Sequence, residues 1–199
     1  MEYALRIDRL RLVTGILVWT LLGPSITASA GQIHLPDLEN KLVDPFHAPA
    51  GVKAIVFLFT GTDCPISNRS APEVRRLYER FAAKGVVFWL VYPNPGDSLE
   101  AIRDHVEAYG YPTRALRDPQ HALVKLAKVS VTPEAAVFNV GGRIVYRGRI
   151  DDRYVDFGVQ RPAPTRRDLE DALTAVLAGK PVLQPTTQAL GCFIADFLR

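Results

Sequence analysis

The segment "FLFTGTDCPISNRSAP", residues 57–72, decides the fold because it joins a buried strand to a helix through a cysteine. The run "VKAIVFLFT" (52–60) is almost entirely apolar and rich in β-branched and aromatic residues, as in a strand that is covered on both faces. Gly61 breaks the run, and Pro65 suits the first position of a helix. The pattern therefore predicts Cys64 at a helix N-terminus.

A cysteine in that position is placed to ionise. The free backbone N–H groups and the positive end of the helix dipole favour an anion, and such positions lower the thiol pKa from its ordinary value of about 8.5. Since the thiolate is the nucleophilic form, Cys64 is a candidate reactive residue. Two other interpretations stay open: a small buried hydrophobic side chain, or a structural disulfide with Cys192, the only other cysteine.

Further elements alternate along the chain. Apolar residues at helical spacing predict a helix from Cys64 to Gly85 that is kinked near its start by Pro72, and "VVFWLVY" (86–92) is a second buried strand that takes Trp89 into the core. The later elements are a helix opened by Asp97 and Glu100, a strand at 113–117, a helix opened by Asp118 and Pro119, a hairpin at Gly141-Gly142, and a last helix capped by Thr165 and Asp168. This order predicts a central mixed α/β sheet flanked by helices.

The two ends of the chain differ from this core. Residues 31–51 contain three prolines among short apolar pieces, which predicts a small hairpin or an extended lead-in. Residues 184–199 are expected to form an irregular tail that carries Cys192, so the folded domain spans 31–183.

The first thirty residues are typical of a secretory signal peptide, with a basic start, the apolar centre "LVTGILVWTLL" (12–22) and the cleavage site "ASA" (28–30). We expect cleavage near Ala30 and a periplasmic or secreted mature chain without a stable membrane span, since eleven apolar residues are short of the roughly 20 needed. A retained membrane anchor is the alternative. The net charge of +3 with scattered Lys and Arg excludes a concentrated basic face for nucleic acid.

These motifs together resemble the thioredoxin superfamily. Pro72 matches the helix kink of that family, and "SVTPEAAVFN" (130–139) resembles its cis-proline loop. The resemblance implies that Pro133 faces Cys64 and that the backbone of Thr132 contacts substrate. More narrowly, "GTDCPISN" (61–68), "VTPEAAVFNVGGRIVYRGRIDDR" (131–153), "LAGKPV" (177–182) and "GCFI" (191–194) resemble the redoxin, peroxiredoxin-like branch related to alkyl hydroperoxide reductase and thiol-specific antioxidant proteins.

Two departures from these relatives bear on function. Thioredoxins carry C-x-x-C, whereas Ser67 stands at the fourth position here, so no second thiol lies one helical turn away. Peroxiredoxins carry P-x-x-x-T-x-x-C, but Gly61 and Phe57 occupy the Thr and Pro positions, and Thr62 is a neighbouring hydroxyl outside that register. If the tail folds back to reach Cys64, Cys192 is the candidate to resolve an oxidised Cys64; a permanent disulfide, a bond to another chain or a metal between the sulfurs is also open.

The remaining polar residues give weaker signals. Arg149 leaves the hairpin near the expected site and is a candidate to hold a thiolate or a peroxide oxygen. Asp151 and Asp152 open a Pro-rich loop that is long enough to serve as a lid or a partner surface. The four histidines lack metal-ligand spacing, and His105 and His121 are expected to be ordinary surface or boundary residues.

The sequence thus predicts an exported thiol-dependent antioxidant oxidoreductase. Its catalytic candidates are Cys64, Cys192, Thr62, Thr132, Pro133 and Arg149. The substrate is a hydroperoxide or, in the alternative, a disulfide, and reducing equivalents come from an external thiol donor without a cofactor or metal. A redoxin fold retained as a non-catalytic binding module is the competing interpretation.

Overall fold

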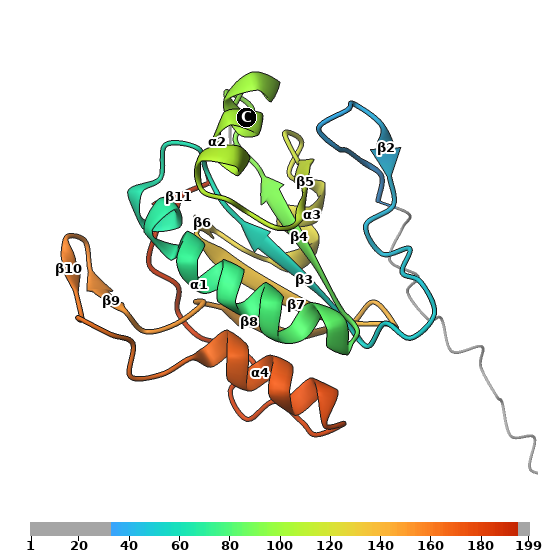
Figure 1. Cartoon of the computed structure of the whole chain (residues 1–199), viewed down its shortest axis with the longest axis vertical. Helices are drawn as coiled ribbons and strands as arrows, with labels where there is room; N and C mark the ends of the chain where they lie inside the picture. The colour runs from blue at the N-terminus through green and yellow to red at the C-terminus, as the bar shows by residue number, and fades with distance from the viewer. Residues whose placement is uncertain (1–32, 195–199) are drawn as a thin grey trace, which may run out of the picture.

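The computed structural model describes residues 33–194, so the predicted signal peptide lies outside the described residues and its cleavage stays a prediction. The helices are α1 (Pro65–Phe81), α2 (Leu99–Ala108), α3 (Ala122–Ala127), α4 (Asp168–Leu177) and a 3₁₀ turn (Ala82–Lys84) (Figure 1). The strands are β1 (Leu35–Pro36), β2 (Leu42–Val43), β3 (Ala54–Phe59), β4 (Val86–Tyr92), β5 (Arg114–Arg117), β6 (Val131–Thr132), β7 (Glu134–Asn139), β8 (Ile144–Gly148), β9 (Tyr154–Asp156), β10 (Val159–Gln160) and β11 (Cys192–Phe193). No helix within the described range has the length and apolarity needed to cross a bilayer.

A five-stranded mixed sheet forms the centre, in the order β5-β4-β3-β7-β8, which confirms the predicted fold class. Strands β3, β4 and β5 are parallel, and β7 and β8 are antiparallel to their neighbours. Strand β3 is central, with Phe57 opposite Trp89 on one side and Ala136 on the other. All six residues of β3 are buried, so the carboxyl end of the strand is held firmly in the core. Cys64 follows a short distance after that end and is positioned by it.

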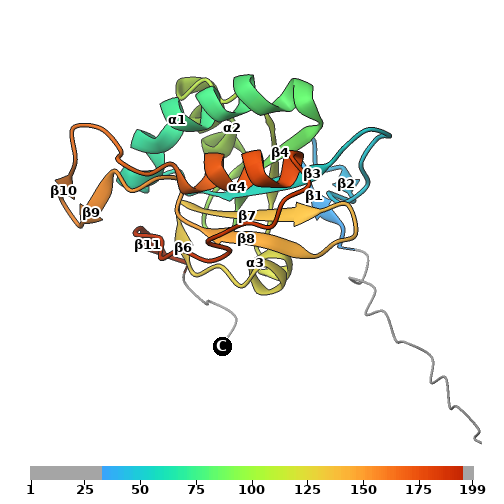
Figure 2. The same ribbon diagram turned by 90° about the horizontal axis from the view of Figure 1, so that it is seen from below.

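Helices cover both faces of the sheet (Figure 2). Helices α1, α2 and α4 pack on one face, where Leu77, Ile102 and Leu169 share a core with Val56 of β3. Helix α3 and the lead-in cover the other face, where Leu123 packs in the same cluster as alternate residues of β3. This alternation explains why β3 and β4 appear in the sequence as continuous apolar runs.

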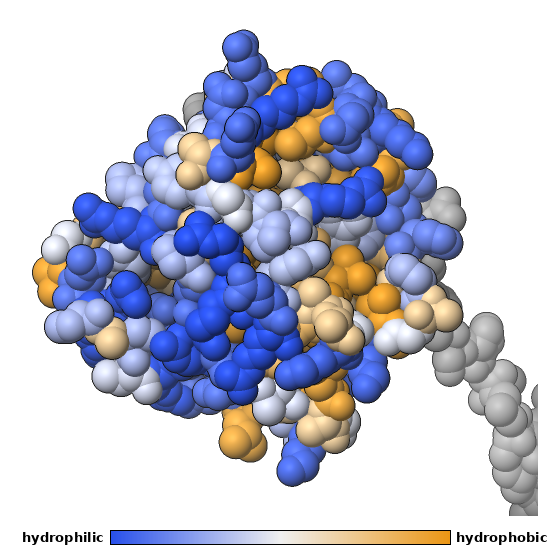
Figure 3. Space-filling view, in the orientation of Figure 1, coloured by the Kyte–Doolittle hydropathy of each residue, from blue (hydrophilic) through white to orange (hydrophobic). Residues whose placement is uncertain are grey.

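An ion-pair cluster fastens α1 to α4. Arg76 and Arg80 of α1 both reach Glu170 of α4, and Glu73 is bound by Arg76 and by Arg167, which precedes α4. Figure 3 shows hydrophilic side chains over this region. The burial of α4 against the sheet and these charged contacts together hold α1, the helix that follows Cys64.

The lead-in and the tail are more ordered than their sequences indicate. The lead-in forms an antiparallel hairpin of β1 and β2, which was one of its two predicted forms. The tail folds back along the domain, first beside β8, where Thr187 N–H donates to Arg147 O (3.0 Å), and then as β11 against β6. The part of the tail up to residue 194 is therefore docked on the domain.

Three predicted helix starts were wrong. Helix α2 is capped by Ser98, whose hydroxyl accepts the Ala101 N–H at 3.0 Å, and not by Asp97, which accepts the Thr62 hydroxyl instead. Helix α3 begins at Ala122 and not at Pro119, because Asp118 turns its buried carboxylate onto the N–H groups of residues 122, 123 and 124 (2.8, 2.9 and 2.9 Å). Helix α4 begins at Asp168 without a Thr165 cap, because Asp152 accepts the backbone N–H (2.7 Å) and the hydroxyl of Thr165. At α3 the buried Asp118 thus makes the capping contacts from several residues before the helix, and at α4 the buried Asp152 takes the contacts of Thr165.

The prediction that His105 and His121 lie at the surface or boundary was also wrong. They are 5% and 3% exposed. His121 Nε2 contacts Pro93 O at 2.9 Å, and His105 contacts the hydroxyl of Tyr92 with Nδ1 at 2.8 Å. Each imidazole is buried because a polar partner compensates for its lost hydration.

Aromatic rings pack together in the hydrophobic core on the face of the sheet that α3 covers, and their burial should stabilise the fold. Phe138 is fully buried between Phe46 (5.1 Å between ring centroids) and Phe57 (5.5 Å). We expect Phe138→Ala to lower the free energy of unfolding by about 3 to 5 kcal/mol, measured by urea denaturation. Leu42→Ala, at a 64% exposed residue, is the control and should change it by less than about 0.5 kcal/mol. Equal losses in both variants would contradict this assignment of the core.

Candidate active site

Cys64 caps the N-terminus of α1, as predicted. Its φ of −82° and ψ of 108° are extended, and its carbonyl accepts the Asn68 N–H at 3.0 Å, the first bond of the helix. Pro65 occupies the first helical position, where a missing N–H costs nothing. The Cys64 side chain is only 1% exposed. The thiol is thus shielded from solvent and lies at the positive end of the dipole of a seventeen-residue helix.

The cis-proline loop provides the opposite wall. The Thr132–Pro133 peptide bond is cis, and the Cys64 thiol donates to the carbonyl of Thr132 at 3.0 Å. The buried carboxylate of Glu134 accepts the N–H groups of Ser130 (2.9 Å) and Val131 (3.4 Å), which holds the loop in place. Pro133 lines a small pocket together with Ile66 of the first turn of α1. Cys64, Thr132 and Pro133 are therefore brought together.

Cys192 joins this group from the end of the chain. Strand β11 pairs antiparallel with β6 so that Cys192 lies opposite Thr132. The Cys192 thiol is within hydrogen-bonding reach of Cys64, and both cysteines are free thiols. The structure therefore describes two free thiols that are far apart in the sequence and close in space.

The two thiols have opposite pKa shifts. Burial raises the pKa of Cys64, but hydrogen bonds from the Cys192 thiol, from the Ser67 hydroxyl and from the backbone of both residues favour the thiolate, and the net pKa lies below the ordinary value. Burial, the hydrogen bond to Cys64 and the charges of Cys64 and Asp63 raise the pKa of Cys192 to about 12. The pair therefore consists of one thiol that ionises readily and one that resists ionisation.

Ser67 is matched to the ionised form of Cys64. Its side chain is 1% exposed, and its hydroxyl has no hydrogen-bond partner among the described residues while Cys64 is a protonated thiol. An unpaired buried hydroxyl is costly, and the thiolate gives it an acceptor. The serine that replaces the second cysteine of C-x-x-C is thus a donor to the sulfur.

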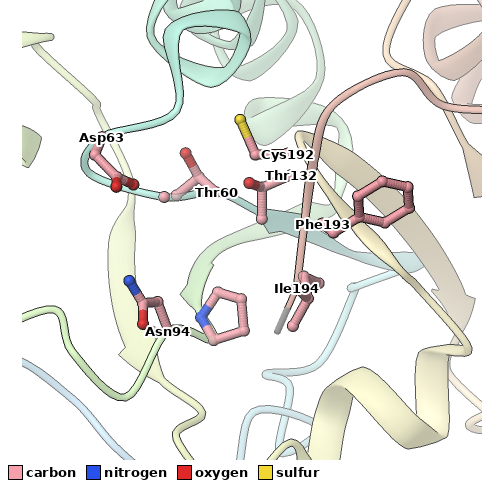
Figure 4. Close-up of a pocket in the computed structure, with 9 residues that line it drawn as sticks. Thr60, Asp63, Asn94, Thr132, Cys192, Phe193 and Ile194 are labelled. Carbon is pink, nitrogen blue, oxygen red and sulfur yellow. The ribbon is translucent and has the colours of Figure 1, made fainter. Parts of the chain in front are cut away.

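A cavity of about 230 Å³ opens beside the pair (Figure 4). It is lined by residues of the β3–α1 loop, of the segment after β4, of β6 and of the tail: Thr60, Gly61, Asp63, Pro93, Asn94, Thr132, Cys192, Phe193 and Ile194. In Figure 4 the Cys192 sulfur points towards α1, whereas the Phe193 ring points away from the cavity. Cys192 rather than Cys64 therefore forms part of the cavity wall.

A buried polar chain supports the loop before Cys64. The Asn68 carbonyl oxygen can only accept, so His105 donates to it through Nε2 (2.8 Å) and accepts the Tyr92 hydroxyl at Nδ1 (2.8 Å). Burial lowers the pKa of His105, which favours this neutral form. The Asn68 amide then donates to Thr62 O (3.4 Å). A mispredicted surface histidine thus helps to position the active loop.

Two predicted site residues direct their polar groups elsewhere. The Thr62 hydroxyl donates to Asp97 at 2.9 Å rather than to Cys64. The Arg149 guanidinium is bound to the buried Asp168, with Nε at 2.7 Å and Nη2 at 3.3 Å, although Arg149 lines the same small pocket as Pro133. Their donors are therefore engaged by Asp97 and Asp168, and a catalytic role for Thr62 or Arg149 stays a prediction.

Asp152, the second of the two adjacent aspartates that open the Pro-rich loop, also makes structural contacts. Asp152 binds the Thr165–Arg166 backbone, and its pKa is lowered to about 2 because these hydrogen bonds and Arg161 outweigh burial. Within residues 33–194 no group of three His, Cys, Asp or Glu side chains is arranged to hold a metal ion.

The sequence matches the model of a known protein family. The family model Redoxin matches residues 23–157, a range that includes Cys64, Thr132 and Pro133. The chain belongs to the Redoxin family. The matched range ends before α4 and β11, so the segment that carries Cys192 is not covered by the family model.

Solved structures share the fold of this redoxin chain. An uncharacterized conserved protein from Geobacillus kaustophilus is 26% identical over 85% of this chain and 91% of its own, with a TM-score of 0.74. A hypothetical protein from Sinorhizobium meliloti is also 26% identical, over 85% and 93%, with a TM-score of 0.72. A secreted Mycobacterium tuberculosis disulfide oxidoreductase is 18% identical over 74% and 96%, with a TM-score of 0.50, which shows the fold alone. No curated protein matches the chain.

Sequence reasoning missed the supporting residues of the redoxin site. Ser67 was noted only as an absent thiol, although its place one turn after Cys64 points its hydroxyl towards the sulfur. Glu134 follows Pro133 directly, and an acidic residue at the start of an apolar strand was a usable signal for a buried contact. Asn68 and His105 gave none, because their contact joins segments that are distant in sequence.

The Ser67 contact predicts a pH effect. Alkylation of Cys64 by iodoacetamide rises as the pH passes the pKa of the thiol, because the thiolate reacts. In Ser67→Ala one donor to the thiolate is lost, so we expect the pKa of Cys64 and the midpoint of its alkylation profile to move to higher pH. Cys64 modification is followed by peptide mass mapping.

Ser70→Ala is the matched control on the same helix. The Ser70 hydroxyl donates to Ile66 O at 2.8 Å and not to the sulfur, so its removal should leave the midpoint unchanged. If Ser67→Ala and Ser70→Ala gave the same midpoint, Ser67 would have no part in stabilising the thiolate.

Proposed function

We propose that the chain is a thiol–disulfide oxidoreductase in which Cys64 is the nucleophile and Cys192 the resolving thiol. The observation that carries this proposal is the reduced pair at the α1 N-terminus, in which the pKa of Cys64 is lowered and that of its neighbour Cys192 is raised to about 12. A pair of thiols in contact can form a disulfide, and the thiol of lower pKa is the one that attacks first.

The reaction has two exchange steps. The Cys64 thiolate attacks one sulfur of a substrate disulfide, which forms a mixed disulfide and expels the other substrate sulfur as a thiolate. Cys192 then loses its proton and attacks Cys64 Sγ, which forms the Cys64–Cys192 disulfide and releases the second substrate thiol. The substrate gains two electrons and the protein pair loses two. An external thiol donor returns the pair to its reduced form.

Hydroperoxide reduction is the second candidate. Cys64 would attack the O–O bond and become a sulfenic acid while an alcohol or water leaves, and Cys192 would condense with it to the same disulfide and release water. The observation that favours it is the cover over Cys64, which is 1% exposed beside a cavity of only about 230 Å³, a size suited to a small oxidant. Disulfide exchange leads because Thr62 and Arg149 direct their donors to Asp97 and Asp168.

The expected export of the chain agrees with either reaction. The sequence "LVTGILVWTLL" followed by "ASA" predicts a signal peptide, and an oxidising compartment permits disulfides to form and exchange. The M. tuberculosis neighbour, a secreted disulfide oxidoreductase, is a protein of the same fold with this activity. We therefore place the proposed activity in the periplasm or outside the cell.

Mass mapping of the reduced mature protein tests the function. The protein is mixed separately with one equivalent of glutathione disulfide and one of hydrogen peroxide, and free thiols are alkylated over time. We expect a Cys64–Cys192 disulfide from glutathione disulfide, formed through a Cys64 adduct, at a rate well above that of free cysteine because more of Cys64 is thiolate. Faster oxidation by peroxide than by glutathione disulfide would reverse the order of the two candidates.

Single cysteine variants provide the controls. Cys192→Ser should accumulate the Cys64 mixed disulfide, and Cys64→Ser should lose turnover while it stays folded. A structural disulfide predicts something else, namely that Cys64→Ser lowers the free energy of unfolding of the oxidised protein by roughly 2 to 5 kcal/mol without an effect on any turnover. A Cys64 that reacts only as slowly as free cysteine would refute both enzymatic proposals.

A further inference from the structure

One sulfur of the cysteine pair is more accessible than the other. Cys192 lies in the wall of the cavity of about 230 Å³, whereas Cys64 does not line this cavity and is only 1% exposed (Figure 4). The two thiols are within hydrogen-bonding reach of each other, so they can join in a disulfide while Cys192 stays on the side of the cavity. A small molecule in the cavity therefore meets Cys192 first.

The acidities of the two thiols favour the same sulfur as the point of attack on the oxidised pair. In thiol–disulfide exchange, a sulfur leaves faster when its thiol has a low pKa. Attack on Cys192 expels Cys64, whose pKa lies below the ordinary value, whereas attack on Cys64 would expel Cys192, whose pKa is raised to about 12. Accessibility and leaving-group ability thus agree.

The size of the cavity limits what can approach Cys192. Pockets for drug-sized ligands measure roughly 300 to 1,000 Å³, and this cavity is smaller, at about 230 Å³. Phe193 and Ile194 follow Cys192 in its wall, and Pro93 lines the side that the segment after β4 forms. The space therefore suits a molecule with few heavy atoms.

The cavity contains one charged side chain, and it is negative. Asp63, directly before Cys64, is the only Asp, Glu, Lys or Arg in the lining, and its charge contributes to the raised pKa of Cys192. Asp63 is exposed, and within residues 33–194 no lysine or arginine forms a salt bridge with it. The carboxylate is therefore available to a positively charged molecule that reaches Cys192.

A second polar group in the lining lacks a partner. Thr60 is 3% exposed, and its hydroxyl has no hydrogen-bond partner among the described residues. The Tyr111 hydroxyl is near it but does not make a full hydrogen bond. An unpaired buried hydroxyl is costly, and an ammonium group in the cavity can donate to it. Thr60 and Asp63 thus both suit a molecule that carries an amino group.

From these observations we infer that this cavity is the entry site of the electron donor, and that the electron donor is a small thiol with a positively charged amino group that attacks Cys192 of the oxidised pair. The inference rests on the proposed function and specifies the class of its reductant. It also assigns the sulfur at which reduction begins.

The reduction has two exchange steps. The thiolate of the first small thiol forms a bond to Cys192 Sγ, the Cys64–Cys192 bond breaks, and Cys64 leaves as a thiolate. A second small thiolate attacks the small-molecule sulfur of this mixed disulfide, and Cys192 leaves and takes up a proton. The protein pair gains two electrons, and two small thiols lose two and become a disulfide. The first step produces a mixed disulfide on Cys192, which can be trapped.

Trapping identifies the attacked sulfur. The reduced protein is first oxidised with diamide, which joins neighbouring thiols whether or not the catalytic cycle operates. The oxidised protein is then mixed with cysteamine, HS–CH₂–CH₂–NH₃⁺, quenched at short times with N-ethylmaleimide and mapped by mass. We expect cysteamine on Cys192 and maleimide on Cys64. The reverse labelling, or a failure of diamide to join the two thiols, would overturn the inference.

Three thiols that share the HS–CH₂–CH₂– group test the preference for charge. Cysteamine is positive, 2-mercaptoethanol is neutral and 3-mercaptopropionate is negative, and the rate of reduction by each charged thiol is divided by the rate with 2-mercaptoethanol. These ratios are compared between protein variants, so the intrinsic reactivity of each thiol cancels. At low ionic strength we expect Asp63→Asn to lower the cysteamine ratio about threefold and to raise the 3-mercaptopropionate ratio. Unchanged ratios would refute the charge selection.

Asp104→Asn is the matched control. It removes the same charge from an exposed residue of α2 that does not line the cavity, so both ratios should stay as in the unmutated protein. A measurement without any substitution guards against altered folding of Asp63→Asn. Added salt screens exposed charges and should bring the cysteamine ratio of the unmutated protein towards that of Asp63→Asn. A ratio that does not depend on salt would contradict the part assigned to Asp63.

The two proposals can fail separately. If glutathione disulfide does not oxidise the pair, the proposed catalytic cycle is wrong, and the diamide-oxidised protein still shows which sulfur a small thiol attacks. If the pair is oxidised by glutathione disulfide but cysteamine labels Cys64, the cycle stands and the assignment of the entry site is wrong.

Discussion

The contact between the Cys64 thiol and the Thr132 carbonyl, at 3.0 Å, is the constraint on which the rest of the site depends. It joins the carboxyl end of the buried strand β3 to the cis-proline loop, two segments that the fold brings together from distant parts of the sequence. The Glu134 carboxylate holds the loop by accepting the Ser130 N–H, and β11 pairs with the strand β6 that contains Thr132. Because Thr132 contacts the Cys64 sulfur and also pairs with Cys192 of β11, the positions of the sulfur and of the tail depend on each other.

The electrostatics of the pair give the reaction a direction. Burial contributes most to the raised pKa of Cys192, and the hydrogen bond and charge of Cys64 raise it further. Once Cys64 is part of a mixed disulfide, its negative charge is gone, and these last two contributions disappear. In the proposed cycle the pKa of Cys192 then falls, while burial still holds it above the ordinary value. Formation of the mixed disulfide would thus favour ionisation of the thiol that is proposed to resolve it.

Local signals made the core of this fold predictable, and long-range contacts made the rest unpredictable. The apolar run before Cys64, Pro65 and the motif around Pro133 are read within a few residues of chain, and each was placed correctly. The proximity of Cys192 could not be predicted, because it depends on the anchoring of Thr187 beside β8. His105 was misread for the same reason, since its partners come from β4 and α1.

Replacement of the second active-site cysteine by Ser67 separates two tasks that C-x-x-C combines. Ser67 keeps a donor to the thiolate inside α1, while the second thiol, Cys192, lies on a strand outside the helix. The Cys192 thiol on β11 lies within hydrogen-bonding reach of Cys64, which is 1% exposed. In the proposed cycle, the pairing of β11 with β6, rather than the helix itself, therefore positions the second thiol.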